Sequence, residues 1–155
     1  MKKGFTLIEF MMVVALIIMF SGLTLPVGFN FYQESTLKDQ ARNLENSLRR
    51  AQAMAMAGHG DSNAGVKIIQ EEQKYIIFEG ESFDPEQRRE EADIIIPFPI
   101  ALSASGTDEI VFQKSTGLLA FPPEETSTTI TFGAFSVEIT INSQGKIERH
   151  EPIKQ

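Results

Sequence analysis

The sequence predicts an α+β fold in which a long N-terminal helix packs against a C-terminal antiparallel β-sheet. A continuous apolar run covers residues 5–25, and helical periodicity follows over about residues 29–57. After Gly60 the pattern changes to short β-rich segments that are separated by turn residues. A helix followed by consecutive short strands is typical of the α+β class, because the sheet covers the apolar face of the helix.

The apolar run predicts a membrane anchor. At about 1.5 Å per residue, a helix over residues 5–25 crosses about 30 Å of hydrocarbon. Lys2 and Lys3 precede the run, so the positive-inside rule places the N-terminus in the cytoplasm and the remainder of the chain outside. A cleaved secretory signal and a buried core helix are the alternatives. The run lacks the small-x-small ending of a secretory signal, which favours the anchor.

Glu9 is the one charged residue in this run. An acidic side chain at the centre of a membrane helix costs about 2.5–3.5 kcal/mol on insertion scales, and less near the headgroups. A carboxylate that simply reaches the headgroup region is one explanation. The alternative is that the protein requires this carboxylate for its function.

The stretch Gly4-Phe5-Thr6-Leu7-Ile8-Glu9, between a short basic leader and a long apolar run, resembles the type IV prepilin family. This family contains the pilins and the pseudopilins of type II secretion. The resemblance implies that a prepilin peptidase cuts between Gly4 and Phe5 and methylates the new amine of Phe5. It also implies that Glu9 meets the Phe5 amine of a neighbouring subunit, which sets the stagger of subunits along a filament.

Gly22, Pro26 and Gly28 form a weakly helical patch at the outer end of the predicted anchor. The resemblance implies that the patch around Gly22 and Pro26 melts locally in filaments, so that subunits can pack and stretch. A simple kink where the helix leaves the membrane is the alternative.

The second half of the predicted helix, residues 29–58, is amphipathic. Apolar residues recur at steps of three and four along one face, and Gly58 is placed to end the helix. We expect the apolar stripe to pack on the sheet, with a coiled-coil partner as the alternative. The stripe consists of Leu37, Ala41, Leu44, Leu48, Ala51 and Ala55, and the charged face of Lys38, Asp39, Arg42, Glu45, Arg49 and Arg50.

Residues 59–155 are predicted to form a β-rich globular domain. Glu71-Glu72-Gln73 is predicted to turn one hairpin, and Asn142-Ser143-Gln144-Gly145 the last one. Pro97 and Pro99 exclude a central strand from the apolar run at 94–102, and the polar segment 83–92 is expected to be a loop. The predicted strands cover residues 66–70, 74–78, 109–113, 128–132, 137–141 and 146–149.

Three segments of the C-terminal half resemble the GspH/FimT group of minor pseudopilins and minor pilins. They are SLRRAQAMAMAGH at the end of the helix, EIVFQKSTG in a central strand and turn, and ITINSQGKIE in the final hairpin, although the group's usual tryptophan is absent. The resemblances divide the chain into a leader peptide (1–4), a transmembrane and assembly half of the helix (5–28), an amphipathic half (29–58) and a GspH/FimT-like domain (59–155).

The residue types indicate neither an enzyme nor a metal or cofactor site. The absence of cysteine excludes disulfides, thiol catalysis and Cys-zinc sites. His59 and His150 lie far apart in sequence and accompany no ligand cluster and no nucleophile-elbow pattern. Gly58-His59-Gly60 and the segment 114–117 are expected to be turns rather than phosphate loops. An acidic loop lacks the ligand spacing of a calcium site and is expected to be solvated; it contains Asp84, Glu86, Glu90, Glu91 and Asp93.

The formal net charge of −7 argues against general binding to nucleic acid, which requires clustered lysine and arginine. Some FimT-like minor pilins bind DNA during uptake, and a few basic residues lie near this C-terminus. Glu148 and Glu151 interleave with them and cancel much of their field. The basic residues are Lys146, Arg149, His150 and Lys154.

The sequence therefore predicts a non-enzymatic minor pilin or pseudopilin of a type IV pilus or type II secretion filament. It would sit in the inner membrane, with its C-terminal domain outside, before it joins the filament. The resemblance implies three partners: the prepilin peptidase, other pilin or pseudopilin subunits, and an inner-membrane assembly platform. No cofactor is expected. The alternatives are a DNA-binding minor pilin of an uptake pilus and a permanently anchored envelope enzyme or binding domain.

Overall fold

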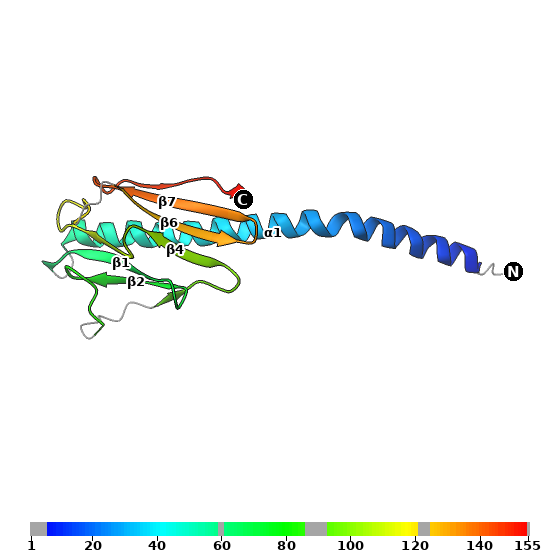
Figure 1. Ribbon diagram of the computed structural model, residues 1–155, viewed down its shortest axis with the longest axis horizontal. Helices are drawn as coiled ribbons and strands as arrows, with labels where there is room; N and C mark the ends of the chain where they lie inside the picture. The colour runs from blue at the N-terminus through cyan, green and yellow to red at the C-terminus, as the bar shows by residue number, and fades with distance from the viewer. Residues whose placement is uncertain (1–5, 59–60, 86–92, 121–124, 155) are drawn as a thin grey trace. The chain divides into compact units, whose positions relative to one another are not determined.

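The computed structural model describes residues 6–58, 61–85, 93–120 and 125–154, without the side chains of residues 22–27 and 125. The chain divides into two compact units, Met1–Gln33 and Glu34–Gln155. We call residues 6–33 the stem and the second unit the domain. Helix α1 (Leu7–Ala57) contributes to both, and the nine strands of the described residues all belong to the domain (Figure 1).

The domain part of α1 is amphipathic, as the periodicity predicts. All six residues of the apolar stripe are fully buried, so the domain itself covers them, without a coiled-coil partner. Gly58 ends the helix with a φ of +65°, a conformation that favours glycine. The Ala55 carbonyl, which the end of the helix leaves without an ordinary helical partner, accepts the N–H groups of Gly58 at 3.1 Å and Ser115 at 3.0 Å.

The first sheet is antiparallel and has the strand order β3-β2-β1-β5. The predicted hairpin at Glu71 is confirmed, because β1 and β2 pair in register from Ala64 with Glu79 to Ile69 with Lys74. Gln73 closes its turn with a φ of +49°. The strands are β1 (Ala64–Ile69), β2 (Lys74–Glu79), β3 (Ile94–Ile95) and β5 (Glu109–Phe112).

The second sheet has the order β4-β6-β7-β8, with β9 also paired to β7. The last predicted hairpin is confirmed: Asn142 Oδ1 accepts the N–H groups of Gln144 at 3.1 Å and Lys146 at 2.9 Å, which closes the turn between β7 and β8. Strand β9 was not predicted, because two residues carry no periodicity. The strands are β4 (Ala101–Ser105), β6 (Glu125–Phe132), β7 (Phe135–Asn142), β8 (Ile147–Arg149) and β9 (Ile153–Lys154).

The strands form two sheets where the sequence predicted one. The chain passes from the first sheet to the second between β3 and β4, in the segment that contains Pro97 and Pro99. Proline cannot donate a ladder hydrogen bond, which explains why the apolar run is divided there. Gln73, in the turn before β2, binds the chain on both sides of these prolines. Its carbonyl accepts the N–H of Ile96 at 2.8 Å, and its side-chain Oε1 accepts the N–H of Leu102 at 2.5 Å.

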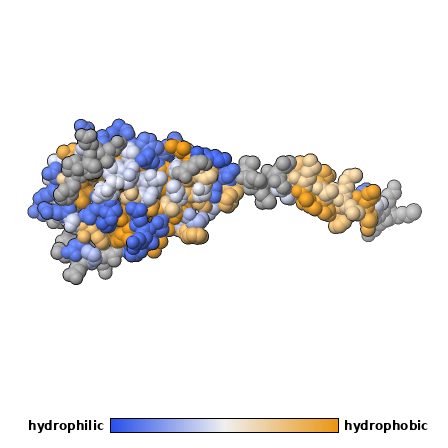
Figure 2. Space-filling view, viewed as in Figure 1, coloured by the Kyte–Doolittle hydropathy of each residue, from blue (hydrophilic) through white to orange (hydrophobic). Residues whose placement is uncertain are grey.

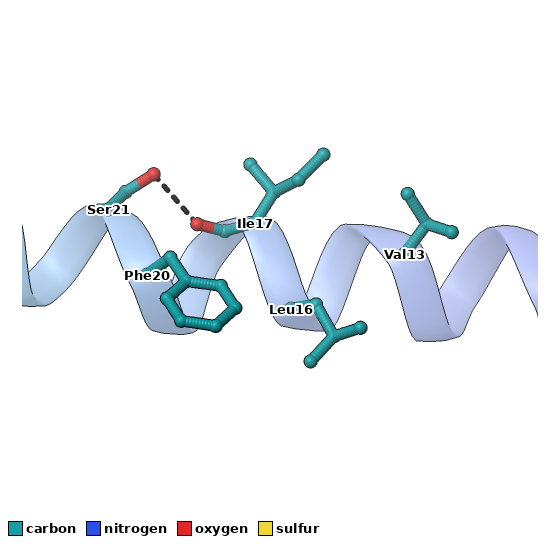
Figure 3. Close-up of a pocket in the computed structure, with 5 residues that line it drawn as sticks. All are labelled: Val13, Leu16, Ile17, Phe20 and Ser21. Atoms are coloured by element: carbon teal, nitrogen blue, oxygen red, sulfur yellow. Dashed lines mark hydrogen bonds between the residues drawn. The ribbon is translucent and has the colours of Figure 1, made fainter.

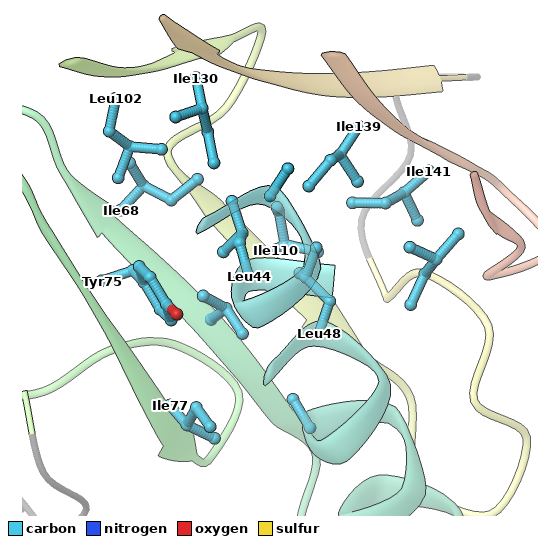
Figure 4. Packing of buried hydrophobic residues seen from close by; sticks show 14 of the residues in the cluster. Leu44, Leu48, Ile68, Tyr75, Ile77, Leu102, Ile110, Ile130, Ile139 and Ile141 are labelled. Carbon is cyan, nitrogen blue, oxygen red and sulfur yellow. The ribbon is translucent and has the colours of Figure 1, made fainter. Parts of the chain in front are cut away.

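The hydrophobic core lies where α1 meets both sheets. Figure 4 shows Leu44 and Leu48 of α1 pointing toward side chains of the two sheets. Each fully buried side chain of this size contributes about 1.5–3 kcal/mol relative to an exposed one. The labelled partners are Ile68, Tyr75, Ile77 and Ile110 in the first sheet, and Leu102, Ile130, Ile139 and Ile141 in the second.

Polar contacts fix the position of α1 along the sheets. Gln52 Nε2 donates to the carbonyls of Gly117 at 3.0 Å and Gly145 at 2.7 Å, in two different turns. A side chain at position 145 has no room, because a Cβ there would lie 2.2 Å from the Gly117 carbonyl oxygen. Both turns can therefore approach the helix closely only because they contain glycine.

Glu45 connects α1 to β8. Its carboxylate accepts hydrogen bonds from Arg49 Nη2 at 2.9 Å and from Arg149 Nε at 3.0 Å. Partial burial opposes ionisation of this carboxylate, but the hydrogen bonds and positive charges of the two arginines outweigh it, so the pKa of Glu45 lies below its ordinary value of 4.5. The contact with Arg149 joins residues that are 104 positions apart in the chain.

Thr128 provides a test of core packing. It is fully buried in β6, and its Oγ1 has no hydrogen-bond partner among the described residues. Thr128→Val keeps the shape and removes the buried hydroxyl, so we expect the free energy of unfolding to rise by about 1 kcal/mol in urea titrations. The matched control is Thr126→Val, which removes a hydroxyl that donates to the Ser105 carbonyl and should lower stability by about 1 kcal/mol. Equal losses in both variants would contradict this account.

The Glu45 contact predicts a pH-dependent stability difference. Glu45→Gln should lower the free energy of unfolding by about 1–2 kcal/mol, since it weakens the charge-assisted hydrogen bonds from Arg49 and Arg149. The folded-state pKa is depressed, so this contribution is fully present above 4.5 and is lost as pH falls through the lower folded-state value. Wild type and variant should therefore converge in acid when urea titrations are repeated across pH.

Glu34→Gln serves as the control for Glu45→Gln. Glu34 pairs with Lys38 at 2.8 Å one helical turn away, and both side chains are more than a third exposed. Such exposed pairs contribute about 0.3–0.5 kcal/mol, so the control should change stability little at any pH. A pH-independent difference for Glu45→Gln would show that the charge of Glu45 does not stabilise the fold.

Candidate functional site

The N-terminal motif begins the stem helix. Because α1 begins at Leu7, Thr6 occupies the N-cap position and Glu9 the third helical position. The backbone N–H and the hydroxyl of Thr6 both donate to Glu9 Oε2 at 2.9 Å, and the Glu9 N–H lies 3.3 Å from Thr6 Oγ1, which accepts it. This reciprocal arrangement is a capping box, and it satisfies amide groups that have no partner in the first helical turn. Gly4 and Phe5 lie outside the described residues.

The sequence carries a signal for this capping box that periodicity did not reveal. A threonine followed three residues later by glutamate, immediately before an apolar run, is the signature of the motif. The sequence predicted a partner for Glu9 only in a neighbouring subunit, and the structure adds Thr6 of its own chain. Both donors are neutral, so they orient the carboxylate without cancelling its charge. Its pairing with a neighbouring amine stays a prediction.

The stem presents an apolar surface. The large hydrophobic side chains described between Leu7 and Phe20 are all exposed, and they form the apolar surface of the stem in Figure 2. A shallow depression in this surface is lined by Val13, Leu16, Ile17, Phe20 and Ser21. Figure 3 shows that Ser21 turns its hydroxyl to the Ile17 carbonyl of its own helix, at 2.7 Å. The depression is therefore lined almost entirely by hydrocarbon, which suits an apolar partner.

Over the part of the chain that the structure describes, no helix meets the length and hydropathy expected of a membrane-crossing segment.

The backbone of α1 is helical through positions 22–27. The side chain of Pro26 lies outside the described residues, so the predicted melting patch at Gly22 and Pro26 is not tested by contacts and stays a prediction.

Carboxylates partner two of the four basic side chains near the C-terminus, Lys146 and Arg149. Lys146 hydrogen-bonds Glu148, which lowers the pKa of that carboxyl, and Arg149 is held 3.0 Å from Glu45. On the adjacent surface of α1, Lys38 lies 2.8 Å from Glu34 and 3.9 Å from Glu151. Neutralising phosphates requires cations that are free to replace counterions, so this arrangement does not favour the DNA-binding alternative.

The residues that could hold a metal ion are not brought together in the described ranges. No cluster of three or more His, Asp or Glu residues with suitable geometry occurs there. Asp93 is 3.1 Å from Lys74, and His150 Nε2 lies 3.2 Å from the Thr140 hydroxyl. His59, Glu86, Glu90 and Glu91 lie outside the described residues.

The segment 114–117 is a turn, as expected. Ser115 and Gly117 both have a φ of +67°, and the segment follows β5 rather than leading into a helix. Lys114 hydrogen-bonds Asp61, and this contact lowers the pKa of the Asp61 carboxyl. A phosphate loop instead connects the end of a strand to the beginning of a helix.

Two solved structures share the fold of this chain, and both are of the minor pseudopilin EpsH from the type II secretion system of Vibrio cholerae. One aligns with a TM-score of 0.55 at 10% identity and covers 74% of this chain and 96% of that chain. The other aligns with a TM-score of 0.56 at 10% identity and covers 79% and 98%. This likeness confirms the predicted fold, a long N-terminal helix packed on antiparallel sheets. No protein-family profile and no curated protein matches the sequence.

Proposed function

We propose that the chain is a non-enzymatic subunit of the minor pseudopilin kind, which assembles with other pilin-like subunits into a type II secretion or type IV pilus filament. The proposal rests on one observation, that a domain with this fold and an apolar stem occur in the same chain. The domain has the fold of a minor pseudopilin. The helix that builds its core continues into a stem with an apolar surface and a single carboxylate, at Glu9.

In this proposal the stem anchors the subunit in the inner membrane before assembly. Lys2 and Lys3 hold the N-terminus in the cytoplasm, where the prepilin peptidase removes the leader after Gly4 and methylates Phe5. The domain stays outside. In the filament, the exposed hydrocarbon of each stem, including the depression at Leu16 and Phe20, packs against other stems.

The capping box gives the assembly step its geometry. Within the described residues both bonds from Thr6 end on Glu9 Oε2, so Oε1 can accept a further donor. A methylated amine at Phe5 of the adjoining subunit supplies that donor and a positive charge. The pair lowers the free energy needed to bury a carboxylate in an apolar bundle of helices. A wrong stagger leaves the carboxylate unpaired, and the full desolvation penalty then applies.

Processing of the N-terminus is the first test. Mass spectrometry of the protein extracted from membranes of cells that contain the peptidase should show a chain that begins at methylated Phe5. A chain that retains Met1, Lys2 and Lys3 in those cells would contradict the proposal. It would favour a permanently anchored envelope enzyme or binding domain.

The role of the Glu9 charge is the second test. Glu9→Gln keeps a side chain that can complete a capping box but removes the charge. We expect the amount of subunit recovered in sheared filaments to fall about tenfold or more, since about 1.4 kcal/mol of lost pairing corresponds to a factor of ten. Thr6→Val is the matched control, because it removes the capping hydroxyl and keeps the carboxylate. Equal losses in both variants, at equal protein levels, would show that Glu9 acts only as a helix cap.

A further inference from the structure

The large exposed apolar side chains of the domain are concentrated at one end. Phe98 is 97% exposed and Ile95 69% exposed, in the segment that joins β3 to β4, and Ile153 of β9 is 63% exposed. Pro97 and Pro99 flank Phe98 and are also exposed. The other two large exposed apolar side chains described in the domain are Met56 and Leu118. We call Ile95, Pro97, Phe98 and Pro99 the apolar tip; Ile153 lies at the same end of the domain, but β6 and β7 separate its strand β9 from β4.

The strand register places the apolar tip at the end of the domain where α1 enters. The opposite end is marked by the contact of Gln52, near the end of α1, with Gly145 in the turn after β7. At about 3.3 Å per residue, β7 is about 23 Å long, so its first residue lies about that far from the turn. The same length corresponds to about fifteen residues of α1, which, counted back from Gln52, reach the part of α1 that enters the domain. Ser136, at the beginning of β7, pairs with Ile153 on one side and with Thr131 of β6 on the other. Thr131 pairs in turn with Ala101, three residues after Phe98.

The apolar tip carries little charge. Residues 94–107 contain no charged side chain. The neighbouring charges of the first sheet pair with one another, since Lys74 lies 2.5 Å from Glu72 and 3.1 Å from Asp93. Pro97 and Pro99 also lack backbone N–H groups, which lowers the cost of removing this segment from water.

We propose that the apolar tip docks on the lipid surface while the subunit is anchored in the membrane before assembly. This inference rests on the proposed function, because it requires a stem that crosses the bilayer. In the last part of the stem, Phe29, Phe31 and Tyr32 are exposed, immediately before the domain begins at Glu34. Tyrosine and tryptophan are enriched at the headgroup level of membrane helices, so Tyr32 marks that level. The end of the domain that α1 enters is therefore the end that meets the headgroups.

Docking would restrict how the waiting subunit turns about its stem. An anchor alone leaves the domain free to rotate about the helix axis. The tip adds a second point of contact with the lipid, and this contact would restrict the rotation. Joining the filament would then require the tip to leave the lipid.

The absence of tryptophan allows a direct test. Phe98→Trp introduces a single fluorophore at a position where exposure makes a folding defect unexpected. The full chain is reconstituted in phosphatidylcholine vesicles, with and without brominated acyl chains, at a low ratio of protein to lipid. We expect a blue-shifted emission and a loss of emission in brominated lipid. Leu118→Trp, at the opposite end of the domain, is the matched control and should show neither.

Leu16→Trp in the stem separates this inference from the proposed function. Quenching of Leu16→Trp without quenching of Phe98→Trp would overturn the docking of the tip and leave the anchored subunit intact. Failure of Leu16→Trp to respond to brominated lipid would overturn the membrane anchor and, with it, the docking. A blue shift of Phe98→Trp that depends on protein density, and that brominated lipid does not quench, would show that the tip binds protein instead of lipid.

Discussion

The burial of one helical stripe between two sheets is the constraint on which the structure depends. Leu44 and Leu48 lie in the centre of this stripe and contact side chains from both sheets. A helix that is covered from two sides cannot slide or rotate without exposing hydrocarbon, so its axial position is determined by the domain. Helix α1 is continuous between the stem and the domain. The core therefore also determines which residue of α1 is the last of the stem.

The same helix must satisfy different requirements at its two ends. Where it leaves the domain core, glycine and backbone hydrogen bonds end it at Gly58. At the beginning, Thr6 and Glu9 satisfy the free amides with side chains. A carboxylate is a good cap in water and an expensive group in hydrocarbon. In the proposed filament, the capping box reduces this conflict. It holds the carboxylate in a defined orientation, from which a single amine can neutralise it.

Local patterns predicted the elements of this fold better than their arrangement. The stripe of α1, the hairpin at Glu71 and the hairpin after Asn142 each depend on residues that are close in sequence, so periodicity and turn chemistry identify them. The connection between the two sheets depends on Gln73, whose backbone and side chain bind Ile96 and Leu102. The bond between Glu45 and Arg149 is more remote still, because it joins residues 104 positions apart. Neither contact leaves a periodic signal, because each pairs single residues across large separations.

The candidate site follows a different rule from the domain. The domain shares its fold with EpsH at only 10% identity, which many combinations of aliphatic side chains permit when their pattern and volume are kept. In the proposed filament the N-terminal segment has no such freedom, because the proposed charge pair requires a carboxylate at Glu9 and an amine on the adjoining subunit. A short N-terminal motif was therefore readable as a family resemblance in a sequence that matches no profile over its length. The sequence identifies Glu9 by its residue type, and the capping box adds the direction of its carboxylate, which the two hydrogen bonds from Thr6 hold in place.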